Sequence, residues 1–250
     1  MGKRLLYKYG SFEGERRNYL KEILLDSKIY FSNPFRFNDP FDLRPRVKRG
    51  SSREERQRAK EKIFKMLSKK FPFDPKSKRK REAARIYARI GGNNSLIDQF
   101  EVILKKYGVY CLSAKCDNLL MWAHYGAAHT GYCLEFDASG GSFFANASEV
   151  HYQADYPVIK LFHSDQDWGK EAVLTKSLDW AYEEEWRLTS TEYGHMKFPA
   201  DELVGIILGC KTAAENVKAA SAWIESRNLP MRIRRAVMND RKYKLDLVVY

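Results

Sequence analysis

Three consecutive carboxylates precede an arginine in the stretch 181–190, AYEEEWRLTS. On a β-strand successive side chains point to opposite faces, so Glu183, Glu185 and Arg187 are expected on one face. Glu184 is expected on the other face. Carboxylates placed in this way can stabilise positive charge that develops in a transition state. A solvated strand face, or a buried Glu–Arg pair that serves only structure, fits the same residues.

Other residues that often carry chemistry lack the spacing which that chemistry needs. His124 and His129 are five residues apart, about 140° around a helix, whereas two imidazoles that share a metal on a helix lie at i and i+4. The four cysteines form no CxxC pair and no zinc-like spacing, which favours reduced, partly buried thiols. The sequence also lacks a Gly-rich dinucleotide loop, a P-loop and a GxSxG motif. We therefore predict no histidine or cysteine metal site and set these enzyme classes aside.

Positive charge is concentrated in one segment. The formal net charge is +12, and residues 44–89 hold 19 Lys and Arg against 5 Asp and Glu, so the rest of the chain is slightly acidic. A patch of one sign attracts polyanions through counterion release. We expect RNA or DNA to bind through residues 44–89, with Lys78, Arg79, Lys80 and Arg81 among the contacts. An acidic protein surface is the second candidate partner, and a solvated helical hairpin without a partner is the remaining alternative.

The composition bounds the class of protein. A chain of 250 residues with 44% hydrophobic and 14% aromatic residues can bury a sizeable core. No apolar run approaches the roughly 18–20 residues that a membrane helix needs, and the opening MGKRLLYKYG lacks the apolar stretch of a signal peptide. We expect a cytoplasmic protein without a membrane partner.

The periodicity of apolar residues predicts strands that alternate with helices. Strands are expected over residues 4–11, 28–32, 107–113, 131–137, 183–190, 202–211, 231–239 and 243–250, with one or two more within 142–161. Helices are expected over residues 15–27, 51–70, 78–90, 95–106, 117–126, 167–183 and 213–228. Asp117 or Asn118 is the expected N-cap of the helix at 117–126. This order predicts a single α+β domain over residues 1–250, with a mixed, mostly antiparallel β core and a basic helical insert at 44–106.

Four sequence clusters resemble a large bacterial family of unknown function. They are LLYKYGSF, KIYFSNPFRFNDPFD, GVYCLSAKCDNLLMWAHYGAAHTGYCLEFD and YEEEWRL. They occur in the order typical of that family and cover most of the chain outside residues 44–100. The activity of that family is not settled, so this resemblance by itself implies no reaction.

The order of elements also resembles the ADP-ribosyltransferase fold of the poly-ADP-ribose polymerases and the DNA-modifying bacterial toxins. In that fold a first strand carries a His or Arg for the NAD ribose, and a central strand leads into a helix with an aromatic for the nicotinamide. A late strand carries a glutamate. Here LLYKY, GVYCLS with NLLMWAHYG, GYCLEFD and EEEWRL follow the same order. The resemblance implies that Tyr7 or Tyr9 takes the ribose position, in place of the usual His or Arg, and that Ser113 ends the central strand.

The same resemblance implies roles for the other candidates. Trp122 or Tyr125 would stack on the nicotinamide and Ser113 would hold its amide, although core packing is the alternative for both aromatics. The spacing of Glu183 and Glu185 is similar to the paired glutamates of the arginine-modifying branch, in which the second is catalytic. Cleavage of the nicotinamide–ribose bond builds positive charge on the sugar, which Glu185 would stabilise. The implied protein is an NAD-dependent ADP-ribosyltransferase-like enzyme, of a toxin or phage-defence type, with a nucleic-acid or nucleic-acid-associated target.

Two further functions stay open. A metal-dependent nuclease would use Asp39 and Asp42 of the loop FNDPFD together with Glu183 and Glu185 as Mg²⁺ ligands. The same loop also fits a turn held by Asx hydrogen bonds. A non-catalytic nucleic-acid-binding module would explain the basic segment and leave the acidic stretch without a role. Nicotinamide release and Mg²⁺-dependent strand breaks distinguish the two enzymes.

Overall fold

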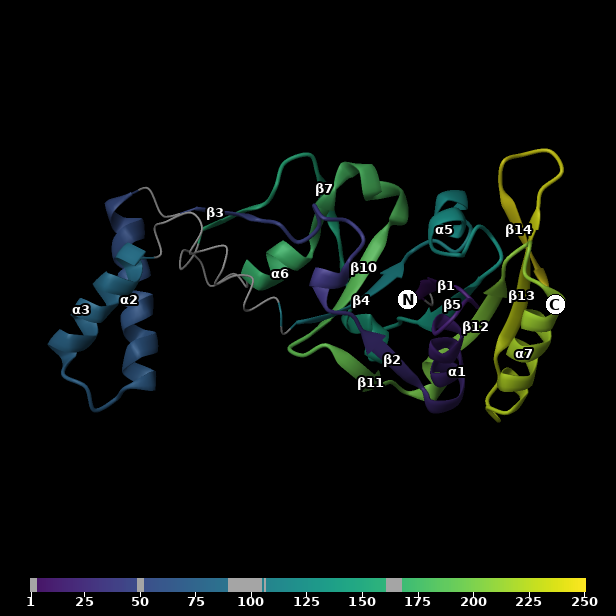
Figure 1. Ribbon diagram of the computed structural model, residues 1–250, viewed down its shortest axis with the longest axis horizontal. Helices are drawn as coiled ribbons and strands as arrows, with labels where there is room; N and C mark the ends of the chain where they lie inside the picture. Colours follow the sequence, from purple (N-terminus) through teal and green to yellow (C-terminus); the bar gives the residue numbers. More distant parts are fainter. Residues whose placement is uncertain (1–3, 49–51, 90–104, 106, 161–167) are drawn as a thin grey trace. The chain divides into compact units, whose positions relative to one another are not determined.

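The computed structural model describes residues 4–48, 52–89, 105, 107–160 and 168–250 (Figure 1). The chain divides into two compact units. The first unit consists of Met1–Arg36, Tyr107–Val150 and Leu178–Tyr250, and the second of Phe37–Lys106 and His151–Ser177. The predicted insert at 44–106 falls within the second unit. That unit also includes residues 151–177, which the sequence did not group with the insert.

The first unit is built on an eight-stranded sheet. Its strands are β1 (Leu5–Gly10), β4 (Gly108–Ser113), β5 (Tyr132–Asp137), β6 (Ser148–Glu149), β10 (Glu185–Ser190), β12 (Leu203–Leu208), β13 (Arg232–Met238) and β14 (Leu245–Val249). Their spatial order is β14-β13-β12-β5-β1-β4-β10-β6. Neighbouring strands pair antiparallel except for β12 and β13, which run parallel. The prediction of an α+β fold with a mixed, mostly antiparallel β core is confirmed.

Helices and a two-stranded sheet complete the first unit. Its α-helices are α1 (Arg16–Asp26), α5 (Leu119–His124) and α7 (Ala214–Glu225), and β2 (Lys28–Phe31) pairs antiparallel with β11 (Gly194–Lys197). Its 3-10 helices are η1 (Pro34–Arg36), η2 (Phe143–Asn146), η3 (Leu178–Glu183) and η4 (Ala200–Glu202). Of the two expected N-caps of α5, Asn118 takes the position, since its side chain accepts hydrogen bonds from the backbone N–H groups of Leu120 at 2.9 Å and Met121 at 3.1 Å.

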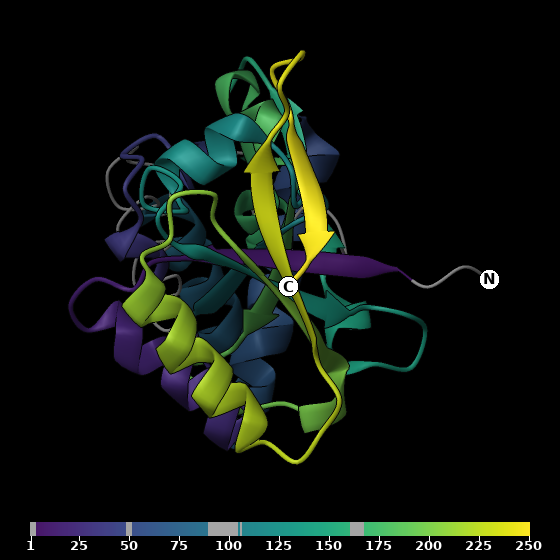
Figure 2. The same ribbon diagram turned by 90° about the vertical axis from the view of Figure 1, so that its right-hand side faces the viewer.

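One face of the sheet packs against α1 and α7. Leu6, Leu134 and Ile206 point to this face from three neighbouring strands and form one buried cluster with Leu20 of α1 and Val217 of α7. The two helices lie side by side (Figure 2). Their apolar residues recur at helical spacing, so each helix buries one stripe and leaves its polar face outward.

The opposite face of the sheet is covered by α5. Tyr9, Cys133 and Ile207 alternate in sequence with the residues of the first face, and they form a second buried cluster with Met121 and Trp122 of α5. The candidate side chains of β1, β4 and β10 point to this second face, which therefore carries the candidate site.

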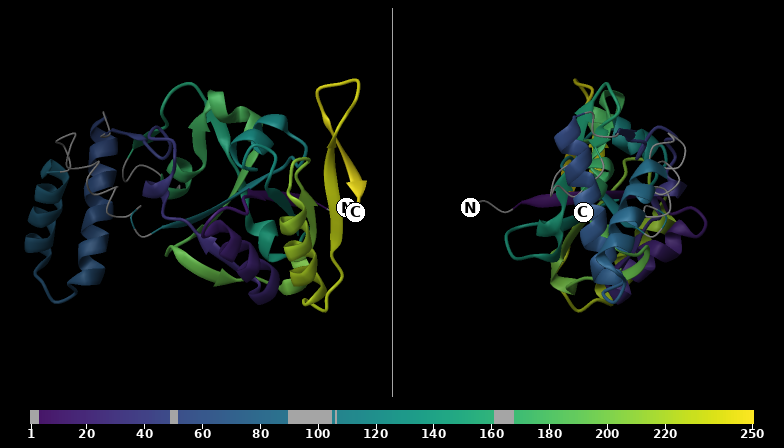
Figure 3. Two further views of the ribbon diagram at one scale, coloured as in Figure 1. Left: turned by 45° about the vertical axis from the view of Figure 1, so that its right-hand side comes forward. Right: turned by 90° about the vertical axis from the view of Figure 1, so that its left-hand side faces the viewer.

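The second unit contains a helical hairpin of α2 (Arg53–Lys70) and α3 (Lys76–Arg89), which Figure 3 shows side by side. Ala59, Ile63, Ala83 and Tyr87 form its small core. The unit also contains α6 (Trp168–Val173) and two pairs of parallel strands, β3 (Arg46–Lys48) with β8 (Val158–Lys160) and β7 (His151–Gln153) with β9 (Thr175–Ser177). Among the described residues, neither α2 nor any other helix combines the length and apolar character needed to cross a membrane.

The predicted helix at 167–183 was wrong over its second half. The helix ends at Val173, and the following residues form β9 and η3. The hydroxyl of Thr175 donates to the backbone carbonyl of Glu171 at 2.8 Å, which satisfies a carbonyl of the last turn. The backbone of β9 then pairs with β7, which residues of a longer helix could not do. The helix predicted at 95–106 lies almost entirely outside the described residues.

Candidate functional site

Three neighbouring strands bring Tyr7, Ser113 and Glu185 into one row. Tyr7 of β1 is paired in register with Ser113 of β4, and Ser113 is paired in register with Glu185 of β10. Side chains directly opposite each other on neighbouring strands point to the same face and have Cβ atoms roughly 4.5–5.5 Å apart. The first strand, the central strand and the late strand of the sequence analysis are therefore adjacent, and one candidate from each lies on the face that α5 covers.

Glu185 forms a buried ion pair with Arg187 on the same face of β10. The Arg187 Nε atom lies 2.8 Å from Glu185 Oε1, and Nη2 lies 2.9 Å from Oε2. The two residues are only 4% and 1% exposed. Two parallel charge-assisted hydrogen bonds of this kind fix the orientation of the carboxylate. The predicted shared face of Glu185 and Arg187 is confirmed.

Glu183 and Glu184 do not continue the strand, contrary to our prediction. The strand β10 begins at Glu185, Glu183 ends η3, and Glu184 has a left-handed backbone with φ of 43°. Glu183 is nevertheless buried, and its Oε1 accepts a hydrogen bond of 2.6 Å from the hydroxyl of Tyr125. Glu184 has a half-exposed side chain 3.8 Å from the ammonium of Lys115. The turn, rather than strand alternation, separates these two acids.

Hydrogen bonds join the end of β4, α5 and η3. The hydroxyl of Ser113 donates to the backbone carbonyl of Glu183 at 2.6 Å and accepts from the backbone N–H of Lys115 at 3.0 Å. The side-chain amide of Asn118 donates to the backbone carbonyl of Tyr182 at 2.8 Å. The N-cap of α5 therefore also holds η3, and the two elements lie together over the end of the row.

Two of the predicted NAD-binding aromatics belong to the core. Trp122 has no exposed surface, and its indole N–H donates to the backbone carbonyl of Cys116 at 2.9 Å. Tyr9 is 6% exposed, packs edge-on against Trp122 with ring centroids 5.3 Å apart, and donates its hydroxyl to a backbone carbonyl. Neither ring is accessible to a ligand in this structure. Tyr7 was the alternative to Tyr9 for the ribose, and Tyr125 the alternative to Trp122 for the nicotinamide. Both are half-buried and keep some exposed surface.

The row continues to a buried acid that the sequence analysis did not single out. Glu135 of β5 lies opposite Tyr7 and has no exposed surface. Its Oε1 pairs with the guanidinium of Arg234. The guanidinium of Arg232 lies 3.9 Å from Oε2, which accepts no hydrogen bond from the described residues. Gly205, the next residue in the row, leaves room for this carboxylate, since any Cβ there would collide with it.

A signal for Glu135 was present in the sequence. It is the only charged residue within the apolar run YCLEF, and a carboxylate in a strand buried on both faces needs a cationic partner.

The position of Glu135 also affects the pKa of Tyr7. Burial, the neighbouring Cys116 and the Glu135 carboxylate raise the pKa of Tyr7 well above the ordinary value. A tyrosine hydroxyl is protonated at neutral pH even at its ordinary pKa, and the shift reinforces this, so Tyr7 can donate a hydrogen bond.

The four predicted nucleic-acid contacts differ in their surroundings within α3. Lys78 pairs with Asp74 at 3.1 Å. Arg79 is turned toward the rest of the hairpin, where its guanidinium lies 5.7 Å from the centre of an aromatic ring of α2 and donates to backbone carbonyls. Lys80 and Arg81 are exposed and form no ion pair with any described acid. Successive residues of a helix point in different directions, so these four cations cannot present a single surface.

The carboxylates of the nuclease alternative are divided between the units. Asp39 and Asp42 belong to the second unit, and Glu183 and Glu185 to the first. Asp39 accepts a hydrogen bond of 2.8 Å from the backbone N–H of Phe41, which is the Asx turn expected for the loop. In the part of the chain that the structure describes, no group of three or more His, Cys, Asp or Glu residues is placed to hold a metal ion.

One part of the chain is similar to a family of unknown function. A family model described as "Protein of unknown function (DUF2971)" matches residues 121–188, which include the end of α5, all of β5 and the start of β10. No curated protein and no solved structure matches the chain. The matched segment contains Tyr125, Glu135, Glu183, Glu185 and Arg187, so it holds every buried acid of the site.

Proposed function

We propose that the chain is an NAD-dependent ADP-ribosyltransferase-like enzyme whose site lies on the α5-covered face of the sheet. The observation that supports this most is the register of Tyr7, Ser113 and Glu185 on three adjacent strands. Three polar side chains in line on a largely buried face are uncommon in strands that serve only packing. The resemblance assigns these three positions to ribose binding, amide binding and charge stabilisation, respectively.

The residues of the row suit this chemistry in type and in order. Glu185 is held by Arg187 in a fixed orientation, so little reorganisation is needed when positive charge develops on a ribose beside it. Tyr7 carries a proton and can donate a hydrogen bond to a sugar hydroxyl. Tyr125 is oriented by its hydrogen bond to Glu183 and offers a ring for the nicotinamide. Ser113 and Glu185 are buried, so NAD would reach them only after a local opening of the site.

Nicotinamide release from NAD by the purified full-length chain tests the proposal. Glu185→Gln should lower turnover about a hundredfold or more with little change in the affinity for NAD. Glu183→Gln should give a smaller loss, because its carboxylate orients Tyr125. Glu184→Gln is the matched control, since this acid is half-exposed and outside the row. Equal turnover in all three variants, at equal folded fraction, would assign the acids to structure alone.

We further propose that the α2–α3 hairpin contacts RNA or DNA. Lys80 and Arg81 are exposed and pair with no acid among the described residues, so their charges can meet phosphates. At the turn of the hairpin Phe73 is fully exposed and Phe71 is 44% exposed, and exposed aromatic rings provide stacking surfaces for unpaired bases. Binding without turnover of NAD would favour the alternative of a non-catalytic nucleic-acid-binding module.

Binding to a fluorescent single-stranded oligonucleotide at several salt concentrations tests the hairpin. Affinity should fall by orders of magnitude between about 50 and 200 mM salt. A double variant with Lys80→Glu and Arg81→Glu should bind more weakly, and Phe73→Ala should weaken single-stranded more than duplex binding. Lys218→Glu, on the exposed face of α7, controls for the loss of a positive charge elsewhere. Binding that is insensitive to salt and to these changes would exclude the hairpin as the contact.

A further inference from the structure

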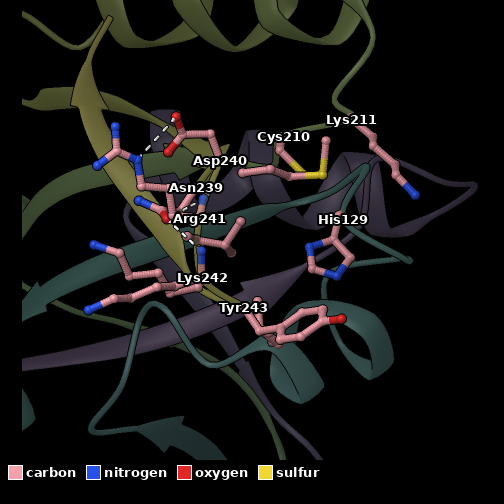
Figure 4. A pocket seen from close by; sticks show the side chains of 12 residues that line it. His129, Cys210, Lys211, Asn239, Asp240, Arg241, Lys242 and Tyr243 are labelled. Carbon is pink, nitrogen blue, oxygen red and sulfur yellow. Dashed lines mark hydrogen bonds and ion pairs between the residues drawn. The ribbon is translucent and has the colours of Figure 1, made fainter.

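A pocket of about 530 Å³ lies beside the turn between β13 and β14 in the first unit. Its walls come from three segments of the sequence, namely α5 with the residues after it, the residues after β12, and residues 238–245. Figure 4 shows His129 and Lys211 on one side and the residues of the turn on the other. The volume lies within the range of roughly 300–1,000 Å³ that is typical of small-molecule sites. None of the residues of the row lines this pocket.

Positive charge dominates the lining. Its charged residues are Lys211, Asp240, Arg241, Lys242 and Lys244. Arg241 lies 3.9 Å from Asp240, but both side chains are more than four-fifths exposed, so this ion pair offsets little of the charge. The single carboxylate therefore leaves an excess of cations.

Two of the cations are available to a ligand. Lys244 is engaged by Asp246, with its ammonium 2.7 Å from the carboxylate. Lys211 and Lys242 are exposed and pair with no acid in the described residues. Lys211 and Lys242 lie on opposite sides of the pocket (Figure 4), and two cations placed in this way favour a ligand with more than one negative oxygen, such as a phosphate.

The turn that carries Lys242 is held in place. Asn239 accepts hydrogen bonds from the backbone N–H groups of Arg241 at 3.0 Å and Lys242 at 2.8 Å. The side-chain amide of Asn239 donates to Asp246 at 2.6 Å, which fastens the turn to β14. A backbone held in this way loses less entropy when a ligand binds. The backbone of the turn is therefore formed before binding.

His129 is placed to respond to an anion. Its backbone carbonyl accepts from the N–H of Lys211 at 3.0 Å, and its Nδ1 atom is buried without a hydrogen-bond partner in the described residues. Burial and the charge of Lys211 lower the pKa of His129. A bound anion would offset the field of Lys211 and favour the charged imidazolium, so the pKa of His129 should rise on binding.

We propose that this pocket binds a phosphate-bearing nucleotide, with Lys211 and Lys242 at the phosphate and Tyr243 against the base. Tyr243 lines the pocket and its side chain is fully exposed, so its ring offers a stacking surface at the rim. Inorganic phosphate fits the cations but leaves the ring unused. This inference does not rest on the proposed enzyme activity.

Calorimetric titration of the full-length chain with ADP, inorganic phosphate and a short single-stranded oligonucleotide tests the proposal. A double variant with Lys211→Gln and Lys242→Gln should weaken binding at least about tenfold, because it removes two charge-assisted contacts. Tyr243→Ala should weaken binding of ADP more than binding of phosphate. Lys197→Gln with Lys218→Gln is the matched control, since these lysines are exposed and lie outside the pocket.

The outcomes distinguish a free nucleotide from a nucleotide within a strand. Tight binding of ADP that needs Lys211 and Lys242 indicates a free nucleotide, and binding of the oligonucleotide alone with the same requirement indicates a nucleotide within a strand. An upward shift of the His129 pKa on binding, followed by NMR and assigned with His129→Gln, supports either case. Unchanged binding in the lysine double variant, no binding of any probe at millimolar concentration, or indifference of ADP to Tyr243→Ala would overturn the assignment.

Discussion

The buried pair of Glu185 and Arg187 makes a prediction that bears on both structure and activity. Removing one partner of a buried ion pair leaves an uncompensated charge, which typically costs about 3–5 kcal/mol of unfolding free energy. The side chains of Arg187 and Glu185 are 0% and 5% exposed and are joined by two hydrogen bonds of 2.8 and 2.9 Å, so the full penalty applies. Both Glu185→Gln and Arg187→Met should therefore destabilise the chain by this amount.

This magnitude can be compared with the whole stability of a domain. A cost of about 3–5 kcal/mol is roughly 10²- to 10⁴-fold in the folding equilibrium, and small domains have a total of about 5–15 kcal/mol. A double variant with Glu185→Leu and Arg187→Met should recover most of the loss, because a buried pair replaced by apolar residues is often neutral in free energy. Lys78→Met is the control, since its pair with Asp74 is largely exposed and should contribute less than about 1 kcal/mol.

Urea unfolding of the single and double variants measures these differences. The cycle formed by Glu185→Leu, Arg187→Met and their double variant should give a coupling energy of at least about 2 kcal/mol, and the slope with urea should stay constant if the native state is unchanged. Single variants that unfold within about 1 kcal/mol of the wild type would refute the inference that the pair is buried and essential. The same experiment gives the folded fraction of Glu185→Gln, without which a loss of turnover cannot be assigned to catalysis.

Three further changes give distinct outcomes. Trp122→Ala should cost about 3–5 kcal/mol, seen as a lower melting temperature without a selective loss of NAD affinity, because the ring has no exposed surface. Gly205→Ala should cost about 1–3 kcal/mol, since its Cβ would collide with the Glu135 carboxylate, whereas Gly140→Ala, with open space around it, should change little in thermal melts. The pKa of His129 in the folded chain is lower than the ordinary histidine pKa of about 6.5. Its neutral form therefore contributes stability above the ordinary pKa, and this stability is lost as the pH falls through the pKa of the folded chain. His129→Gln should therefore lose less stability than the wild type between about pH 7 and 5 in urea unfolding, and an identical pH dependence would show that His129 is not desolvated.

The sequence by itself determined much of the local structure. Short apolar and aromatic runs located β1, β4, β5 and β12, and helical spacing located α1, α2, α3 and α7. The two-residue period of a strand placed Glu185 and Arg187 on one face, and Asn118 was one of the two N-caps expected for α5. These features depend on backbone geometry and on neighbours within a few residues, so they can be predicted from short stretches of sequence.

Only the tertiary structure decided which candidates meet. Strand order depends on pairings between segments more than a hundred residues apart, and it is this order that places Tyr7 beside Ser113 and extends the row to Glu135. Burial likewise separates Trp122, which is enclosed by the sheet, from Tyr125 one turn later, which is not. The pocket beside the β13–β14 turn is assembled from three distant segments. Long-range packing sets these outcomes, because local periodicity says which side of an element is apolar but not what that side will contact.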